Sequence, residues 1–185
     1  MKIKRCGKAS PLTKQQFLEI LNDLVDPHRL IFALCWYTSE RPITICRLKV
    51  SDVYDDRGKV RSTLVIPARV TKTRTTREVP THRHLQALLS RYVPVGDDWL
   101  FPSDEDEFRH IPRDTYSRYL ARVFARRGMV GYTCYSTRRG SLTHLARSGV
   151  GLRTIQQLSG HSRLDSLQHY LEVSEAELRE TISLL

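Results

Sequence analysis

Three residues able to act together on a phosphate ester lie between positions 135 and 170. Arg138 is followed 23 residues later by His161, and Tyr170 comes nine residues after that histidine. A guanidinium and an imidazole hold and polarise anions through charge-assisted hydrogen bonds, and a phenol is a nucleophile. Together the three residue types indicate chemistry on a phosphodiester.

Glycines supply the local structure that brings these residues together. Gly149 and Gly160 each follow a run of apolar residues at helical spacing, and glycine is the residue that most often follows a helix end. The sequence therefore predicts three short helices between 135 and 170. Arg138 opens the first, His161 follows the end of the second, and Tyr170 lies on the third.

A second arginine precedes another predicted helix. Arg41 stands before Pro42 and the apolar run Ile43–Leu48, and proline favours the first position of a helix. Arg41 is then expected at a helix N-terminus, which favours a bound anion. An ordinary surface arginine beside a loop is the alternative reading of this residue.

Residues 53–80 change from helical to β character. A strand is predicted at Ser62–Ile66 and the end of another at Glu78–Pro80, with residues 68–77 between them. Four cations in this connection are Arg69, Lys72, Arg74 and Arg77. The connection is either a solvated hairpin tip or a finger that reaches phosphates.

The other helices follow from capping signals and apolar periodicity. Thr13 with Gln16 three residues later predicts a capping box, and Leu12 is placed to pack on Phe17. Further helices are predicted over Leu30–Tyr37, after Thr81 as N-cap, over Arg113–Arg127, and after a second capping box at Ser174 and Glu177. The helix at 113–127 carries an arginine at every fourth position, namely Arg118, Arg122 and Arg126. This basic ridge is either a solvated helix face or a surface for the DNA backbone.

The composition indicates which class of molecule the chain binds. The chain has 185 residues and a formal net charge of +10, with cations interleaved among apolar positions, so a polyanion is expected and nucleic acid leads over an anionic membrane. No apolar run approaches the roughly 20 residues that span a bilayer, and no signal peptide is visible, so a cytoplasmic location is expected.

Metal and cofactor sites are not indicated. The four cysteines, Cys6, Cys35, Cys46 and Cys134, are scattered without ligand spacing, which indicates reduced thiols. His82 and His84 lack cysteine or carboxylate partners and are interpreted as polar residues of a first helical turn. We therefore expect neither a metal nor an organic cofactor.

These motifs together resemble the catalytic domain of the tyrosine recombinases, the phage-integrase family. That family pairs an arginine after a buried helix with a hairpin lysine, a His-x-x-Arg motif, a Leu-x-Gly-His motif and a tyrosine nine residues after that histidine. The matching positions here, in order, are Arg41, Lys72, Arg138, Leu158–His161 and Tyr170. The resemblance runs over nearly the whole chain from Thr13.

Four positions depart from the family pattern. Tyr135 stands where the family has the first histidine of His-x-x-Arg, and Arg139 replaces the histidine of its usual Arg-His pair. Thr44 occupies the position of a common acidic residue, and Ser39–Glu40 replaces the usual Gly-Leu.

The resemblance implies a fold and a set of roles. It implies an α+β, mainly helical bundle with a small antiparallel three-stranded sheet on one edge. It also implies that Tyr170 is the nucleophile of site-specific DNA recombination, giving a 3′-phosphotyrosyl intermediate, with Arg41, Arg138 and His161 on the phosphate, Lys72 as general acid, and Tyr135 orienting phosphate or nucleophile. Residues expected to hold double-stranded DNA are Arg69, Arg74, Arg77, Arg118, Arg122 and Arg139.

The resemblance also sets expectations for organisation and assembly. Residues 1–10 are expected to form a flexible arm and residues 11–185 the catalytic domain, without the family's N-terminal core-binding domain. The chain then corresponds to an excised catalytic domain or to a short recombinase like the fimbrial DNA invertases. A monomer in solution is expected to form a tetramer on DNA through its C-terminal helix. Two other functions stay open, an inactive DNA-binding regulator and a type IB topoisomerase-like relaxing enzyme.

Overall fold

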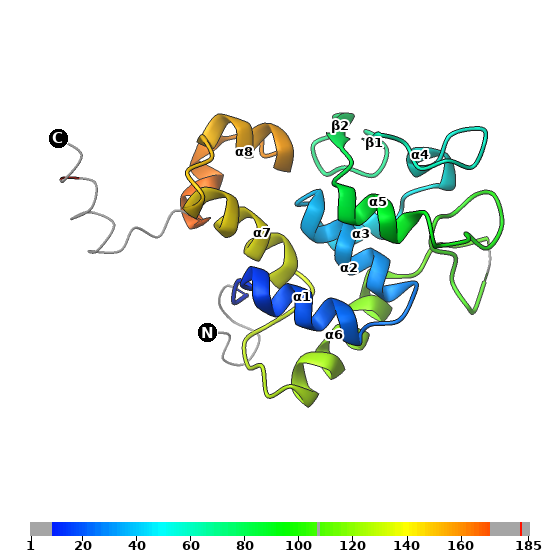
Figure 1. Ribbon diagram of the computed structural model, residues 1–185, viewed down its shortest axis with the longest axis horizontal. Helices are drawn as coiled ribbons and strands as arrows, with labels where there is room; N and C mark the ends of the chain where they lie inside the picture. Colours follow the sequence, from blue (N-terminus) through cyan, green and yellow to red (C-terminus); the bar gives the residue numbers. More distant parts are fainter. Residues whose placement is uncertain (1–8, 107, 171–181, 183–185) are drawn as a thin grey trace.

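The computed structural model describes residues 9–106, 108–170 and 182, and Figure 1 shows their arrangement. Helices dominate, with one small sheet. The elements are α1 (Lys14–Asp23), α2 (His28–Tyr37), α3 (Pro42–Cys46), α4 (Val50–Val53), β1 (Thr63–Ile66), β2 (Arg77–Pro80), α5 (Arg83–Leu89), α6 (Arg113–Arg126), α7 (Ser136–Arg147), α8 (Leu152–Ser159) and the 3₁₀ helix η1 (Leu164–Tyr170). Most of the expected arm at 1–10 and the helix expected after Ser174 lie outside the described residues.

The central helix is α2. It packs on α1, α3, α5 and α7, and its residues from Leu30 to Trp36 are all buried. Phe17 of α1 stacks on Trp36 with ring centroids 4.4 Å apart. A helix that is apolar nearly all round lies in the interior, as the run Leu30–Tyr37 predicts.

Capping explains where two other helices begin. The Thr13 hydroxyl accepts from the Gln16 backbone N–H at 3.1 Å, and the Gln16 side chain accepts from the Thr13 N–H at 3.0 Å, so the predicted capping box is confirmed. Thr81 is not the cap of α5, and that prediction is wrong. Its N–H donates to the Ser62 carbonyl, so Thr81 continues the sheet pairing and His82 caps the helix.

The sheet has two strands rather than the expected three. β1 and β2 pair antiparallel, with Leu64 opposite Val79. The third strand reduces to an isolated bridge between Tyr54 and Val60. It is short because the chain turns through Gly58, at φ +70°, and the residues after it bond back to residues 53–55 instead of extending along β1.

A close contact at Gly140 fixes α7 against α1 and α2. A Cβ added to Gly140 would lie 2.8 Å from the Leu12 backbone nitrogen and 2.9 Å from the Trp36 ring. Only glycine admits this approach without a shift of the backbone. Because Arg138 is two residues earlier on the same helix, the contact also fixes where Arg138 emerges.

A separate small core holds the end of the described chain. Leu142 of α7, Ile155 of α8 and Leu167 of η1 are buried together, and Tyr170 packs against them. Figure 1 shows α7, α8 and η1 in succession at one side of the molecule. None of the helices in the described part of the chain has the length and apolar character needed to span a bilayer.

Candidate active site

The turn between α2 and α3 presents Arg41. Ser39 in this turn has φ +52°, a left-handed conformation uncommon for a residue with a side chain. Arg41 is then extended, at φ −75° and ψ 144°, and Pro42 begins α3, as predicted. The turn points the Ser39 carbonyl at Arg138, whose Nη1 donates to it at 2.5 Å.

Arg138 is the most enclosed cation of the site. The residue is 4% exposed and lies in the first turn of α7. Its Nη2 donates to the Ser159 carbonyl at 3.0 Å, so Arg138 joins the α2–α3 turn to the end of α8. Burial, reinforced by the charge of Arg41, lowers the pKa of Arg138 to about 10, and the guanidinium stays charged at neutral pH.

His161 is positioned by the end of α8. Gly160 adopts the left-handed conformation at φ +65°, as the predicted helix stop requires, and His161 follows it. Its Nδ1 lies 2.6 Å from the Ser159 hydroxyl and its Nε2 lies 3.2 Å from Arg138 Nη2. Burial and the charges of Arg138, Arg41 and Arg77 lower the pKa of His161 to about 4, so the imidazole is neutral at neutral pH.

Tyr170 ends η1 beside this histidine. The two ring centroids are 5.9 Å apart, and the Tyr170 side chain is hydrogen-bonded to Arg138. One side of the phenol packs on the small core of Leu142, Ile155 and Leu167. The other side faces a pocket, so the packing holds the hydroxyl toward the arginines.

One pocket of about 260 Å³ unites these groups. We call it the arginine pocket, and its lining residues are Ala9, Arg41, Tyr135, Arg138, Arg139, His161 and Tyr170. Five of the six residues predicted to be catalytic therefore meet in one place, from four separate elements. Two of the pocket's three lining arginines, Arg41 and Arg138, together with the Tyr170 phenol suit a phosphodiester, because forked donors match its two non-bridging oxygens.

Lys72, the sixth predicted catalytic residue, does not line this pocket. It is exposed in the connection between β1 and β2. The neighbouring Arg74 has φ +52°, and the Thr71 hydroxyl accepts from the Thr75 N–H at 3.1 Å, which closes a tight tip. The segment is a tight tip between β1 and β2, and its lysine is exposed and stands apart from the pocket.

Tyr135 has a partner that the sequence did not suggest. Its side chain is 37% exposed, and its hydroxyl accepts from Arg113 Nη1 at 3.4 Å. This hydrogen bond, with that to Asp114, raises the pKa of Arg113. Arg113 begins α6 and Tyr135 precedes α7, so this bond joins the starts of the two helices at the rim of the arginine pocket, at the position where the family pattern has a histidine.

The residues expected to contact DNA fall into two groups. Arg74, Arg118 and Arg122 are exposed. Arg69 is exposed too, and it also pairs with Asp52 at 2.5 Å. Arg77 is turned inward rather than outward, with its side chain 11% exposed, and it pairs with Glu40 and donates to the Leu158 carbonyl. Arg139 lines the arginine pocket itself.

Glu40 is the site residue that sequence reasoning missed. It is 2% exposed, lies beside Arg41, and pairs with both Arg77 and Arg138. The one signal in the sequence was an acidic residue where the family pattern has an apolar one. Among the described residues, no group of three histidine, cysteine, aspartate or glutamate side chains is placed to hold a metal ion.

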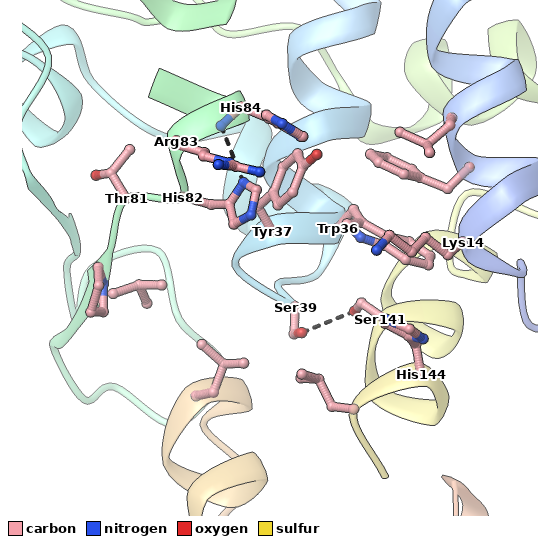
Figure 2. Close-up of a pocket in the computed structure, with 16 residues that line it drawn as sticks. Lys14, Trp36, Tyr37, Ser39, Thr81, His82, Arg83, His84, Ser141 and His144 are labelled. Carbon is pink, nitrogen blue, oxygen red and sulfur yellow. Dashed lines mark hydrogen bonds between the residues drawn. The ribbon is translucent and has the colours of Figure 1, made fainter. Parts of the chain in front are cut away.

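A second hollow lies behind the site, and Figure 2 shows its labelled side chains. We call it the aromatic hollow; its volume is about 590 Å³ and it lies between α1, α2, α5 and α7. Trp36 and Tyr37 face it, and His82 stacks on Tyr37 at 4.5 Å. The Ser39 and Ser141 hydroxyls, 2.9 Å apart, join its two sides. Its cationic and imidazole residues are Lys14, His82, Arg83, His84 and His144.

Comparison with known proteins identifies the relatives of this chain. Residues 10–177 match the model of the phage integrase family. The tyrosine recombinase XerA of Thermococcus onnurineus is 30% identical over 176 residues, which are 91% of this chain and 60% of that protein. The tyrosine recombinase XerD of Brucella abortus is 32% identical over 117 residues, 58% of this chain and 38% of that protein. The chain thus spans about 60% of the length of XerA.

Solved structures share the fold. A crystal structure of XerA recombinase superposes with a TM-score of 0.75 at 21% identity, over 97% of this chain and 66% of the other. The Tn1549 transposon integrase in complex with transposon right end DNA gives a TM-score of 0.75 at 16% identity, over 97% of this chain and 67% of the other.

Proposed function

Since this chain belongs to the phage integrase family, we propose that it performs site-specific DNA recombination by breaking and rejoining strands through a tyrosine-linked intermediate. The observation that supports this most is the convergence of Arg41, Arg138, His161 and Tyr170 on one pocket. Both guanidiniums and the phenol face the same small volume, where a single phosphate can contact all of them.

In the proposed reaction the Tyr170 oxygen attacks phosphorus. The bond from Tyr170 to phosphorus forms as the bond from phosphorus to the 5′ oxygen breaks, leaving a 3′-phosphotyrosyl link and a free 5′-hydroxyl. The phenol loses a proton and the 5′ oxygen gains one, so the step needs no external oxidant or energy source. Rejoining is the same exchange in reverse with another 5′-hydroxyl.

The arginines stabilise the charge that builds on the phosphate. Arg41 and Arg138 donate to the non-bridging oxygens, and those hydrogen bonds strengthen as the transition state gains charge. His161 contributes a further donor once the phosphate draws Arg138 toward itself and the imidazole proton moves from Nδ1 to Nε2. Tyr135 orients the phosphate or the nucleophile at the rim.

Lys72 is the proposed general acid for the departing 5′ oxygen. Because it lies outside the arginine pocket in the free protein, the hairpin tip must close on bound DNA for the ammonium to reach that oxygen. The exposed cations Arg74, Arg118 and Arg122 are proposed to hold the DNA backbone, which makes affinity fall steeply with salt and carries little sequence information.

Assembly is proposed to use the aromatic hollow. Residues 171–185 carry four glutamates and an apolar stripe at Leu178, Ile182 and Leu185. The hollow offers apolar walls with a cationic and imidazole rim, so the C-terminal segment of a neighbouring copy complements it in both respects. We propose that this exchange joins protomers into a tetramer on DNA, while the free protein is a monomer in the cytoplasm.

Leu18 allows a test of this assembly. It lines the aromatic hollow and is 40% exposed, whereas Val25 is 64% exposed and lies outside the hollow. Leu18→Glu is expected to abolish the higher-order complex on DNA, measured by light scattering after gel filtration, and Val25→Glu is expected to keep it. Equal assembly by both variants would overturn the proposed use of the hollow.

The experiment that tests the function uses duplexes with randomised sequence and a nick. A nick lets the short 5′-hydroxyl strand diffuse away, so rejoining stops and the covalent protein–DNA adduct accumulates. The DNA in that adduct can then be sequenced. Recovery of a defined sequence with the link at Tyr170 supports the proposal. Tight binding without a link would favour a DNA-binding regulator, and relaxation of supercoiled plasmid without sequence preference would favour a topoisomerase-like enzyme.

A further inference from the structure

A buried carboxylate lies among the arginines of the site. Glu40 is 2% exposed, and both of its oxygens are occupied. Oε1 pairs with Arg77, while Oε2 accepts from the Arg41 backbone N–H at 2.8 Å and lies 3.4 Å from Arg138 Nη1. One side chain therefore touches three arginines from three separate parts of the chain.

This carboxylate limits how Arg138 can turn. Arg138 Nη1 is held between the Ser39 carbonyl at 2.5 Å and Glu40, and Nη2 is held by the Ser159 carbonyl at 3.0 Å. Fixing the inner edge of a planar guanidinium also fixes the direction of its outer donors. The outer donors are those that face His161 and the arginine pocket.

Arg77 extends the same control to His161. It donates to the Leu158 carbonyl and lies 3.4 Å from the Gln157 carbonyl, so it holds the last turn of α8. A Cβ added to Gly160 would lie 2.5 Å from Arg77 Nε, which shows how closely the guanidinium packs on the residue before His161. Glu40 anchors Arg77 in this place.

The energetics favour a role in geometry over a role in stability. Removing a carboxylate from water costs several kcal/mol, and pairing inside the protein often does no more than offset that cost. An apolar residue would fill the same space without this cost. The advantage of a carboxylate at this position is that it orients Arg77 and Arg138, two cations that would otherwise repel each other.

We propose that Glu40 is a positioning residue for strand cleavage, setting Arg138 directly and His161 through Arg77. This inference rests on the proposed function. It predicts that Glu40→Gln, which keeps the shape but removes the charge, binds DNA about as well as wild type but cleaves it about 10- to 100-fold more slowly, as small misplacements of reacting groups do. Asp52→Asn is the matched control, because Asp52 is a buried carboxylate that also pairs with an arginine and accepts from a backbone N–H.

The cleavage arm uses the full chain and a nicked duplex that wild type cleaves. Single-turnover cleavage and DNA affinity are measured at a temperature where all variants are folded. Glu40→Gln should lose rate with affinity within about twofold, and Asp52→Asn should stay within about threefold of the wild-type rate. A Glu40→Gln rate within about threefold of wild type, or an equal loss in both variants, overturns the proposal.

A second arm needs no DNA and separates this inference from the proposed function. Amide hydrogen exchange of residues 157–161 in the free protein reports whether the end of α8 is held. Faster exchange there in Glu40→Gln and in Arg77→Met, but not in Asp52→Asn, supports the route through Arg77. Unchanged exchange in Glu40→Gln overturns it, whether or not the protein cleaves DNA.

Discussion

The Arg138 guanidinium lies 3.2 Å from Nε2 of His161, although 23 residues separate them in the chain. Arginine can only donate, so Nε2 is the acceptor in this contact. The neutral imidazole then carries its proton on Nδ1 and donates it to the Ser159 hydroxyl, 2.6 Å away. The free protein thus holds its histidine in one tautomer, with Nε2 directed to the cation that is proposed to bind phosphate.

The lowered pKa of His161 predicts how stability depends on pH. The folded pKa is about 4 and the ordinary value is 6.5, so between these values the unfolded chain binds more protons than the folded one. Stability should therefore fall as the pH drops from 6.5 toward 4 and should not change from this cause above 6.5. Urea unfolding of wild type and His161→Gln across this range is expected to show a shallower slope for the variant. Parallel slopes would contradict the neutral, enclosed imidazole.

Tyr135→His should place the histidine of the family pattern at the rim of the pocket. We expect cleavage to accelerate by about 3- to 10-fold, because a histidine supports proton transfer better than a phenol at neutral pH. Tyr135→Phe is the control, since it removes the hydroxyl that bonds Arg113 and adds no titrating group. Single-turnover cleavage measures both, and a slower Tyr135→His protein would show that the phenol is the better-suited group in this site.

Gly140→Ala tests the packing that positions Arg138. Its Cβ would lie within 3 Å of the Leu12 backbone and the Trp36 ring, so we expect a loss of about 2–4 kcal/mol in the free energy of unfolding. Gly151→Ala meets nothing within 4 Å and has an ordinary backbone conformation, so its effect should stay under about 1 kcal/mol. Denaturant unfolding distinguishes them, and equal losses would contradict the close approach of α7.

Arg138→Lys tests whether the planar guanidinium of Arg138, with its several donors, is needed in addition to its charge. A lysine keeps the charge but cannot hold the Ser39 and Ser159 carbonyls while also donating to phosphate. Cleavage is expected to fall by about 100-fold or more, with a much smaller effect on DNA affinity. Arg57→Lys, at an exposed turn, controls for the substitution. A cleavage rate near wild type for Arg138→Lys would mean that charge alone suffices.

Local signals in the sequence predicted most of the helices and several of their ends, but not the short helix α4 at Val50–Val53. The capping box at Thr13, the glycine stop at Gly160 and the proline start at Pro42 each depend on a few neighbouring residues, and the structure confirms them. The prediction for Thr81 was wrong because the sheet region engages its hydroxyl as well as its N–H. The hydroxyl donates to the Arg61 carbonyl at 2.7 Å, and His82 caps α5 instead. The third strand that the resemblance implied is absent from the described sheet, because residues 53–61 bond to one another across the Gly58 turn.

Contacts between distant segments were beyond local reasoning. Arg77 sits in a basic run, so its charge suggested an exposed residue, yet Glu40 and the end of α8 draw it inward. The contacts of Glu40 could not be predicted either, because its partners Arg77 and Arg138 lie far from it in the sequence. The glycine stops predicted that Arg138, His161 and Tyr170 come together. That Arg41 joins them was expected only through the family resemblance, because no local signal brings residue 41 beside residue 161.

Covalent capture shows whether Tyr170 attacks the DNA phosphate. Wild type and Tyr170→Phe are incubated with the pool of nicked duplexes, and protein linked to DNA is separated under denaturing conditions and mapped by mass spectrometry. The proposed mechanism predicts a link through Tyr170 in wild type and none in Tyr170→Phe, with DNA binding retained in both. A link that persists in Tyr170→Phe, or wild type that binds DNA tightly and never forms one, would contradict it.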